Sequence, residues 1–97
     1  DDMAAGAARA AAAFPAYKDT IFVGVGGNLA GIDAILAGQE TMTVAVDGYD
    51  VGYLGVQAAV DALNGKKLDE FIATDATVVT ADNAAERRAE VEKRLGQ

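Results

Sequence analysis

The sequence lacks several of the residue types on which catalytic and metal sites depend. Its 97 residues include no cysteine and no histidine, and serine is absent as well. Without them a protein has no disulfide, no cysteine or serine nucleophile, and neither the commonest general base nor the commonest zinc ligand. A catalytic mechanism would have to rest on Asp, Glu, Lys, Tyr, Thr or a cofactor. Together with the ordered motifs described below, these absences predict no catalytic residue, no metal site, no cofactor and no enzymatic activity.

Positive charge is scarce, and long apolar runs are missing. The chain has 8 Lys and Arg against 15 Asp and Glu, for a formal net charge of −7. This balance argues against nucleic acid or an anionic membrane surface as a partner. No segment approaches the roughly 18 apolar residues of a membrane span. The absence of cysteine fits the cytosol as well as a periplasmic or extracellular setting, so composition leaves the compartment open.

The residues that are present alternate between helix and strand patterns. Apolar runs rich in β-branched residues predict strands at 20–25, 41–46 and 76–80. Apolar residues at helical spacing predict helices at 1–14, 29–37, 51–63 and 83–95. Strands separated by helices imply an α/β fold with a parallel sheet. So small a sheet has two open edges and a small core, so we expect the chain to be a fragment of a longer protein.

Helix faces and caps follow from the same patterns. We expect the first helix to bury an apolar stripe, formed by Met3, Ala7, Ala10 and Phe14. The third helix should bury Val51, Leu54, Ala58 and Ala62. Short polar residues in front of the last three helices predict side-chain caps, at Asn28, Asp50 and Asp82.

Glycine loops follow the first two strands. One runs Gly24-Val25-Gly26-Gly27-Asn28, and the other begins at Asp47-Gly48. Ligands of open α/β sheets bind at the carboxyl ends of the strands, so these loops are the place to look for a site. A dinucleotide-binding loop is one hypothesis, although its third glycine would fall on Leu29. A tight strand-to-helix turn and the close approach of a small ligand are the others.

Two polar residues in these loops have two interpretations each. Asp47 ends the second strand, where its carboxylate could accept hydrogen bonds from ligand hydroxyls or form a local turn with Gly48. Asn28 could contact a ligand or cap the following helix. The residue types alone favour the local role at both positions. Tyr49 and Tyr53 are one helical turn apart, and we expect them to pack on each other.

Three stretches carry a family resemblance: DDMAAGAARA, FVGVGGNLAGIDAILAGQETMTVAVDGYDVGYLGVQAAVDALNGKK and FIATDATVVTADNAAE. The first is similar to an N-D-x-M-A-x-G-A segment without its leading Asn. The second is similar to a V-G-F-D-G…T-V-A-Q…L-x-G-K block, and the third to a closing V-T-x-D-N segment. In this order, and over most of the chain, they resemble the C-terminal part of the periplasmic sugar-binding proteins of the ribose-binding type. Those proteins are the capture components of bacterial ABC importers.

The resemblance implies a two-lobed α/β protein with its ligand in the cleft between the lobes. Residues 1–46 would be part of the C-terminal lobe. Residues 47–72 would form a hinge crossing and a helix that belongs to the N-terminal lobe. Residues 73–97 would supply the return strand and the C-terminal helix. Such a segment should become ordered against the remaining part of its own parent chain or against a swapped copy.

The same resemblance assigns site residues. The ligand-binding Asp after V-G-F in the family corresponds to Gly26 here, and the Gln or Asn after T-V-A corresponds to Val46. The Asn of N-D-x-M-A would precede Asp1. Because both matched positions are apolar, the neighbouring Asn28 and Asp47 are expected to supply polar contacts. The ligand-binding candidates are therefore Gly26, Asn28, Val46 and Asp47.

The function implied by the resemblance is capture of a small solute, a sugar or polyol, by closure of the lobes. The partners would be that solute and the membrane permease of the importer, with no nucleic acid. A signal peptide in the precursor and a periplasmic or membrane-anchored extracellular location also follow. Two alternatives stay open, the effector-binding domain of a sugar-responsive transcriptional repressor and a dinucleotide-binding enzyme domain.

Overall fold

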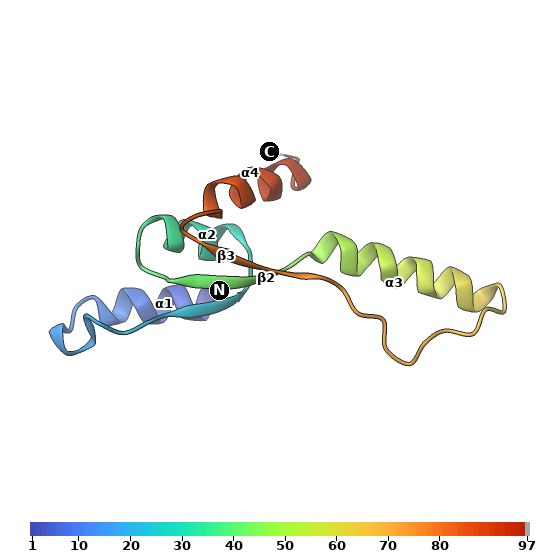
Figure 1. Ribbon diagram of the computed structural model, residues 1–97, viewed down its shortest axis with the longest axis horizontal. Helices are drawn as coiled ribbons and strands as arrows, with labels where there is room; N and C mark the ends of the chain where they lie inside the picture. The colour runs from blue at the N-terminus through green and yellow to red at the C-terminus, as the bar shows by residue number, and fades with distance from the viewer. Residues whose placement is uncertain (97) are drawn as a thin grey trace.

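The computed structural model describes residues 1–96, which form a body and a projecting arm (Figure 1). The body comprises residues 1–46 and 76–96, and the arm comprises residues 47–75. The radius of gyration is 17.0 Å, and the principal extents are 59 × 29 × 19 Å. A compact domain of about 100 residues has a radius of gyration of about 13 Å, so the arm makes this molecule elongated.

Helices and strands alternate along residues 1–96 in the predicted order. The helices are α1 (Asp2–Ala11), α2 (Leu29–Leu36), α3 (Gly48–Leu63) and α4 (Ala84–Arg94). The strands are β1 (Val23–Gly26), β2 (Met42–Val46) and β3 (Ala76–Thr80). A single 3₁₀ turn in this part of the chain, η1 (Pro15–Tyr17), follows α1. Helix α1 stops short of Phe14, which is extended because the ring of the following proline disfavours helical backbone there.

The sheet is mixed, with strand order β1-β2-β3. Strands β1 and β2 are parallel, as predicted, whereas β2 and β3 are antiparallel, so the prediction of an all-parallel sheet is wrong for the last strand. The antiparallel direction of β3 follows from the path of the arm. Helix α3 runs away from the end of β2 without packing on the sheet, and the chain returns to that same end. Strand β3 therefore enters the sheet where β2 leaves it, paired from Val46 with Ala76 to Met42 with Thr80.

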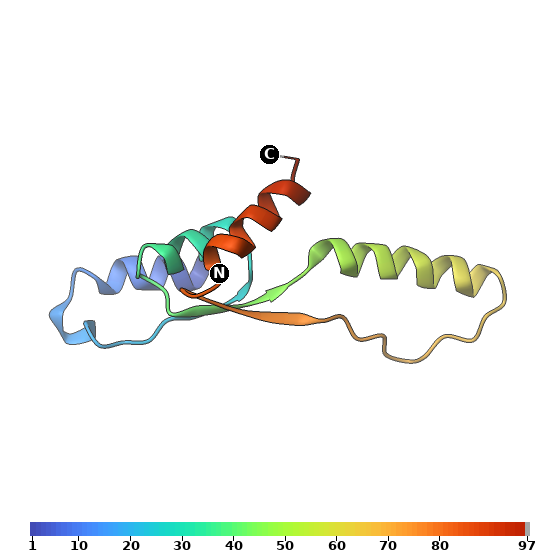
Figure 2. The same ribbon diagram turned by 45° about the horizontal axis from the view of Figure 1, so that its top comes forward.

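Helices α1, α2 and α4 lie on one side of the sheet (Figure 2), and α2 packs between the other two. The core beneath them is small and consists of Ile32, Ile35, Ala45, Val79 and Ala84. The strands contribute Ala45 and Val79, which alternate with residues of the opposite face as the pleat requires. This packing holds the carboxyl ends of β1 and β2 at a fixed edge of the body.

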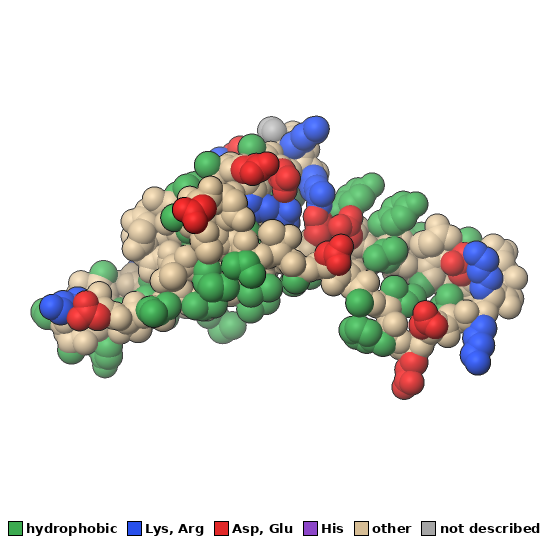
Figure 3. Space-filling model, viewed as in Figure 1, with side chains coloured by type: hydrophobic (Ala, Val, Ile, Leu, Met, Phe, Trp, Pro, Cys, Tyr) green, Lys and Arg blue, Asp and Glu red, His purple; other side chains and the backbone are tan. Residues whose placement is uncertain are grey.

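The opposite face of the sheet is uncovered by any helix of residues 1–96. Val25, Val44 and Val78 form one row across it, and Val25 is 64% exposed. Figure 3 shows hydrophobic side chains gathered along the side of the body that is lower in that view. The apolar run of β1 predicts burial on both faces, and in this structure only one face is buried. The second face has the composition of a surface that packs against further chain.

Two predicted helix faces are wrong. Helix α1 buries Ala5 and Ala8, while Met3 is 89% exposed. Small alanines allow α1 to lie close against β1 and α2, and this close packing outweighs the larger apolar stripe on its other side. Helix α3 buries no residue within the described chain, so its predicted stripe from Val51 to Ala62 has no partner here.

The caps of two helices differ from the prediction. Asn28 caps α2 as expected, because its side chain accepts a hydrogen bond from the Gly31 amide. Helix α3 is capped by Asp47 instead of Asp50, so it begins at the very end of β2. The residue before α4 is Asn83 instead of Asp82, and its side chain bonds the end of β3. Asp47 and Asn83 lie close to the strand ends, and their side chains accept hydrogen bonds from backbone amides of the adjoining turns.

Candidate functional site

The four ligand-binding candidates lie together at one edge of the sheet. Strand β1 ends at Gly26 and β2 at Val46, and parallel pairing brings these carboxyl ends side by side. A cavity of about 350 Å³ opens there, and Gly26, Asn28, Val46 and Asp47 all line it. The rest of its lining comes from Gly27, Gly48 and Tyr49, from Arg87, Val91 and Arg94 on α4, and from Leu95 just after that helix.

Sequence reasoning missed the contribution of α4. Its residues Arg87, Val91 and Arg94 recur at four- and three-residue spacing, so they form one stripe along the helix that faces the cavity. Their residue types predict a solvated helix face for Arg87 and Arg94, and this prediction is wrong for Arg87, whose side chain is only 14% exposed. The spacing within α4 was a signal for a shared stripe, but nothing local indicated that this stripe meets the end of β2.

Asp47 is held by several partners. Its Oδ1 accepts a hydrogen bond from the Tyr49 amide at 3.1 Å, and its Oδ2 is 3.8 Å from Arg87 Nη2. Arg94 also forms an ion pair with Oδ2. The Asp47 side chain is only 16% exposed, so these charges interact in a partly desolvated setting where they are stronger than on an open surface. The local interpretation of Asp47 is therefore confirmed, and the carboxylate also ties α4 to the start of the arm.

The tyrosines at the start of the arm pack as expected. The Tyr49 and Tyr53 rings are stacked, with centroids 6.4 Å apart and planes 12° apart. The guanidinium of Arg94 lies over the Tyr49 ring, 5.9 Å from its centroid, within range of a cation–π interaction. Arg94 is thus held in place from two sides, by a carboxylate and by an aromatic face.

Asn28 has its local role as well. Its Oδ1 accepts a hydrogen bond from Gly31 N at 3.0 Å, and its Nδ2 lies 3.4 Å from Oδ1 of Asp2. The backbone amide of Asn28 donates to Oδ2 of Asp1 at 2.8 Å. A dinucleotide would place its pyrophosphate on the amides at this helix N-terminus. Here a carboxylate of the chain itself takes the Asn28 amide, which argues against the dinucleotide hypothesis.

The glycines of the loop make room for Asp1. Its Oδ1 also accepts a hydrogen bond from Thr43 Oγ1 at 2.5 Å, so one carboxylate joins β2 to the loop after β1. A Cβ on Gly24 would lie 2.4 Å from that oxygen, and a Cβ on Gly31 would lie 2.5 Å from Cγ of Asp1. The tight turn is confirmed too, because Gly27 has a φ of +75° and lies against Ala45.

Glu40 is the second carboxylate near Gly24. It is 4% exposed, and neither carboxylate oxygen has a hydrogen-bond partner within residues 1–96. Burial raises the pKa of Glu40 above its ordinary value, and the Gly24 amide offsets only part of that effect. The amide is close enough to act on the charge but does not meet hydrogen-bond geometry. Glu40 therefore favours its protonated form more than an exposed glutamate does.

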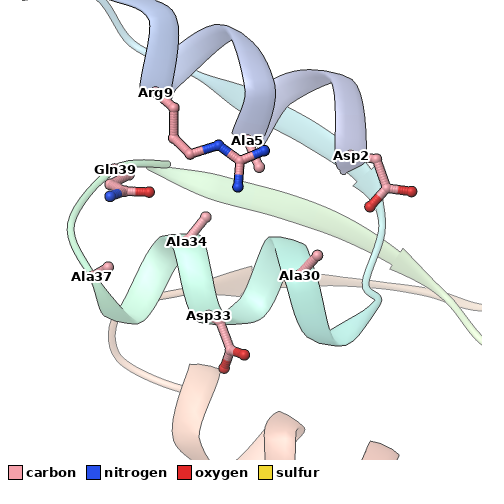
Figure 4. Close-up of a pocket in the computed structure, with 8 residues that line it drawn as sticks. All are labelled: Asp2, Ala5, Arg9, Ala30, Asp33, Ala34, Ala37 and Gln39. Atoms are coloured by element: carbon pink, nitrogen blue, oxygen red, sulfur yellow. The ribbon is translucent and has the colours of Figure 1, made fainter. Parts of the chain in front are cut away.

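A larger cavity, of about 430 Å³, lies between α1 and α2 (Figure 4). Half of its lining is alanine, namely Ala5, Ala30, Ala34 and Ala37. Arg9 extends from α1 toward α2, whereas Asp33 points away from α1, toward α4, where Arg88 Nε binds it at 2.7 Å. This groove lies between two helices, away from the strand ends, and its polar groups do not converge. We therefore place the candidate site at the smaller cavity.

The described residues contain neither a metal cluster nor a membrane-spanning helix. No group of three or more His, Cys, Asp or Glu side chains in residues 1–96 could hold a metal ion. No helix in that range is long and apolar enough to cross a bilayer.

Comparison with known proteins gives one curated relative and one solved structure of note. The chain is 36% identical over 80 residues to the ribose import binding protein RbsB of Haemophilus influenzae, covering 82% of this chain and 27% of that protein. It matches an ABC transporter solute binding protein from Bacillus halodurans C-125 with bound myo-inositol, with a TM-score of 0.78 and 31% identity. That match covers 93% of this chain and 31% of the other. No protein-family model matches the chain.

These matches define the class: the fold is that of part of a periplasmic solute-binding protein. Within this class, the chain belongs with the ribose-binding type of sugar-binding proteins of ABC transporters, as the sequence motifs indicated. It spans about a quarter to a third of the length of these relatives. Both relatives are named as binding proteins, so the chain belongs with a non-enzymatic family.

Proposed function

We propose that the protein is the solute-binding component of a sugar-type ABC importer and captures a sugar or polyol in the cavity at the ends of β1 and β2. The observation that carries this proposal is the convergence of Gly26, Asn28, Val46 and Asp47 on one cavity. These residues come from two separate loops, and a ligand at that edge would contact both. The bound myo-inositol of the solved relative supports a small polyhydroxylated solute.

We propose the same division into lobes that the sequence suggested. Residues 1–46 belong to the C-terminal lobe, 47–72 cross to the N-terminal lobe, and 73–97 return. The support is the arm: α3 leaves the end of β2 and finds no packing partner within residues 1–96. The two crossings run beside each other where Val46 pairs with Ala76 (Figure 1). Bending there would close the lobes over a ligand at the neighbouring cavity.

The partners and location follow from the same proposal. The permease of the importer would receive the captured solute, and the protein would act in the periplasm or on the outer surface as a membrane-anchored component. Its precursor would carry a signal peptide. The remaining part of the parent chain, or a swapped copy, would cover the exposed apolar surfaces of the arm and of the sheet.

A ligand screen tests the proposal. The complete gene product that carries this sequence should show a raised melting temperature with at least one solute from a panel of pentoses, hexoses, inositols and sugar acids. A ligand at 100 times its Kd stabilises the folded state by about 2.7 kcal/mol, which a thermal-shift assay resolves. The absence of a shift with every solute would contradict solute capture. Sequence-specific binding to DNA would instead favour the repressor alternative.

A further inference from the structure

The charged side chains that line the cavity are Arg87, Arg94 and Asp47. Both arginines pair with Asp47, and Arg87 also pairs at 3.0 Å with Glu90, which lies outside the lining, so Arg94 is the cation with fewer partners. Resting on the function proposed above, we propose that the solute is a small polyhydroxylated carboxylate, a sugar acid, and that Arg94 binds its carboxylate group. This assigns a ligand class and a specificity-determining residue to the cavity.

The carboxylate and amide oxygens of the cavity lining already have partners. Both oxygens of Asp47 are engaged, one by the Tyr49 amide and one by the two arginines. The Asn28 oxygen accepts from the helix it caps. Gly26 and Val46 have no polar side-chain atoms. Within the described residues, each carboxylate and amide oxygen of the lining already has a partner, so a neutral sugar would have to share these acceptors with the groups that now use them.

Hydrogen-bond donors, in contrast, remain available to a ligand. A guanidinium has five N–H groups in a planar fork, and that fork matches a carboxylate better than it matches a single hydroxyl. Nε of Arg87 is buried and has no hydrogen-bond partner among residues 1–96. The Arg94 side chain is 44% exposed, so it keeps N–H groups that a ligand can reach.

Arg94 is also positioned before any ligand arrives. Its ion pair with Asp47 and its place over the Tyr49 ring restrict the long side chain from two directions. A restricted arginine loses less conformational entropy on binding than a free one. The glycine at position 26 matters as well, because a carboxylate there would repel an anionic solute at the same edge of the sheet.

The test compares anionic and neutral probes on the complete gene product. D-gluconate and D-galacturonate should bind more tightly than D-ribose and myo-inositol in calorimetric titrations. Arg94→Gln should weaken binding of the sugar acid by about tenfold or more, because a charge-assisted contact is lost. Arg88→Gln is the matched control: Arg88 lies on the same helix but pairs with Asp33 and Glu92, away from the cavity. It should leave the affinity unchanged.

The outcomes separate this inference from the function on which it rests. Tight binding of ribose or inositol with no binding of either acid would overturn the inference and leave solute capture standing. Failure of every probe would count against both. If Arg94→Gln does not fold, the salt dependence of the unmodified protein decides: Kd for the sugar acid should rise with ionic strength. A Kd that is independent of salt would contradict a guanidinium–carboxylate contact.

Discussion

The body and the arm contain helices of similar character that meet opposite environments. Helix α2 has 8 residues and buries Ile32 and Ile35, whereas α3 has 16 residues and buries none within the described chain. Val56 is 67% exposed and Leu63 is 88% exposed. Both helices are apolar enough to pack, but only α2 has a sheet and two neighbouring helices beside it. An apolar stripe therefore indicates that a surface needs a partner without indicating where the partner is.

The sharpest way to test this contrast is to remove apolar volume from each part. Ile32→Ala should lower the free energy of unfolding of the 97-residue chain by about 2–5 kcal/mol, because it leaves a cavity in the only core of the body. Val56→Ala, on the exposed side of α3, should change it by less than about 0.5 kcal/mol. Urea denaturation of both variants measures the difference. Equal losses would show that the arm packs against another copy in solution.

Glycine substitutions give a second comparison. Gly31→Ala in α2 should destabilise the chain by about 1–3 kcal/mol, because the new Cβ meets the Asp1 side chain. Gly52→Ala in α3 meets nothing within 4 Å in the described structure and should stabilise the arm by about 0.5–1 kcal/mol through helix propensity. Thermal unfolding followed by circular dichroism reports both. A neutral Gly31→Ala would mean that Asp1 does not occupy the space beside Gly24 and Gly31.

The smallest expected effect compares two carboxylates whose pKa values shift in opposite directions, Glu40 in the body and Asp61 in the arm. The pKa of Glu40 in the body is raised from 4.5 by burial, so the folded state keeps a proton that the unfolded chain releases. Stability from this group is therefore complete below pH 4.5 and is lost as the pH rises through the pKa of the folded state. Glu40→Gln should remove this loss, so the stability of the variant should fall less as the pH rises than that of the original chain.

Asp61 in the arm provides the control with the opposite sign. Its pKa is lowered by hydrogen bonds from Gln57 and Lys66, so its contribution is lost as the pH falls. Asp61→Asn should instead flatten the acid side of the pH profile and leave the slope of its alkaline side unchanged. Denaturation curves between pH 4 and 8 would contradict the account if Glu40→Gln kept the pH dependence of the original chain.

The comparison also shows which features the sequence could reveal. Strand β3 was predicted with the correct bounds, and Asn28 was recognised as a cap, because both depend on residues close together in the chain. The direction of β3 was not predictable from periodicity, since it depends on where the arm returns. The contacts of Asp1 with Thr43 and of Asp47 with Arg87 join distant segments, and no local pattern encodes them.

The paired crossing beside Val46 and Ala76 has a mechanical consequence. The chain passes between body and arm twice, and the two passages are hydrogen-bonded neighbours up to that last pair. A single connecting segment would let the arm rotate about its backbone bonds. Two hydrogen-bonded segments resist such twisting and bend mainly perpendicular to the plane of the sheet. Bending at this pair would therefore move the arm mainly along one arc, and a closure of the arm over the body would cost little rotational freedom.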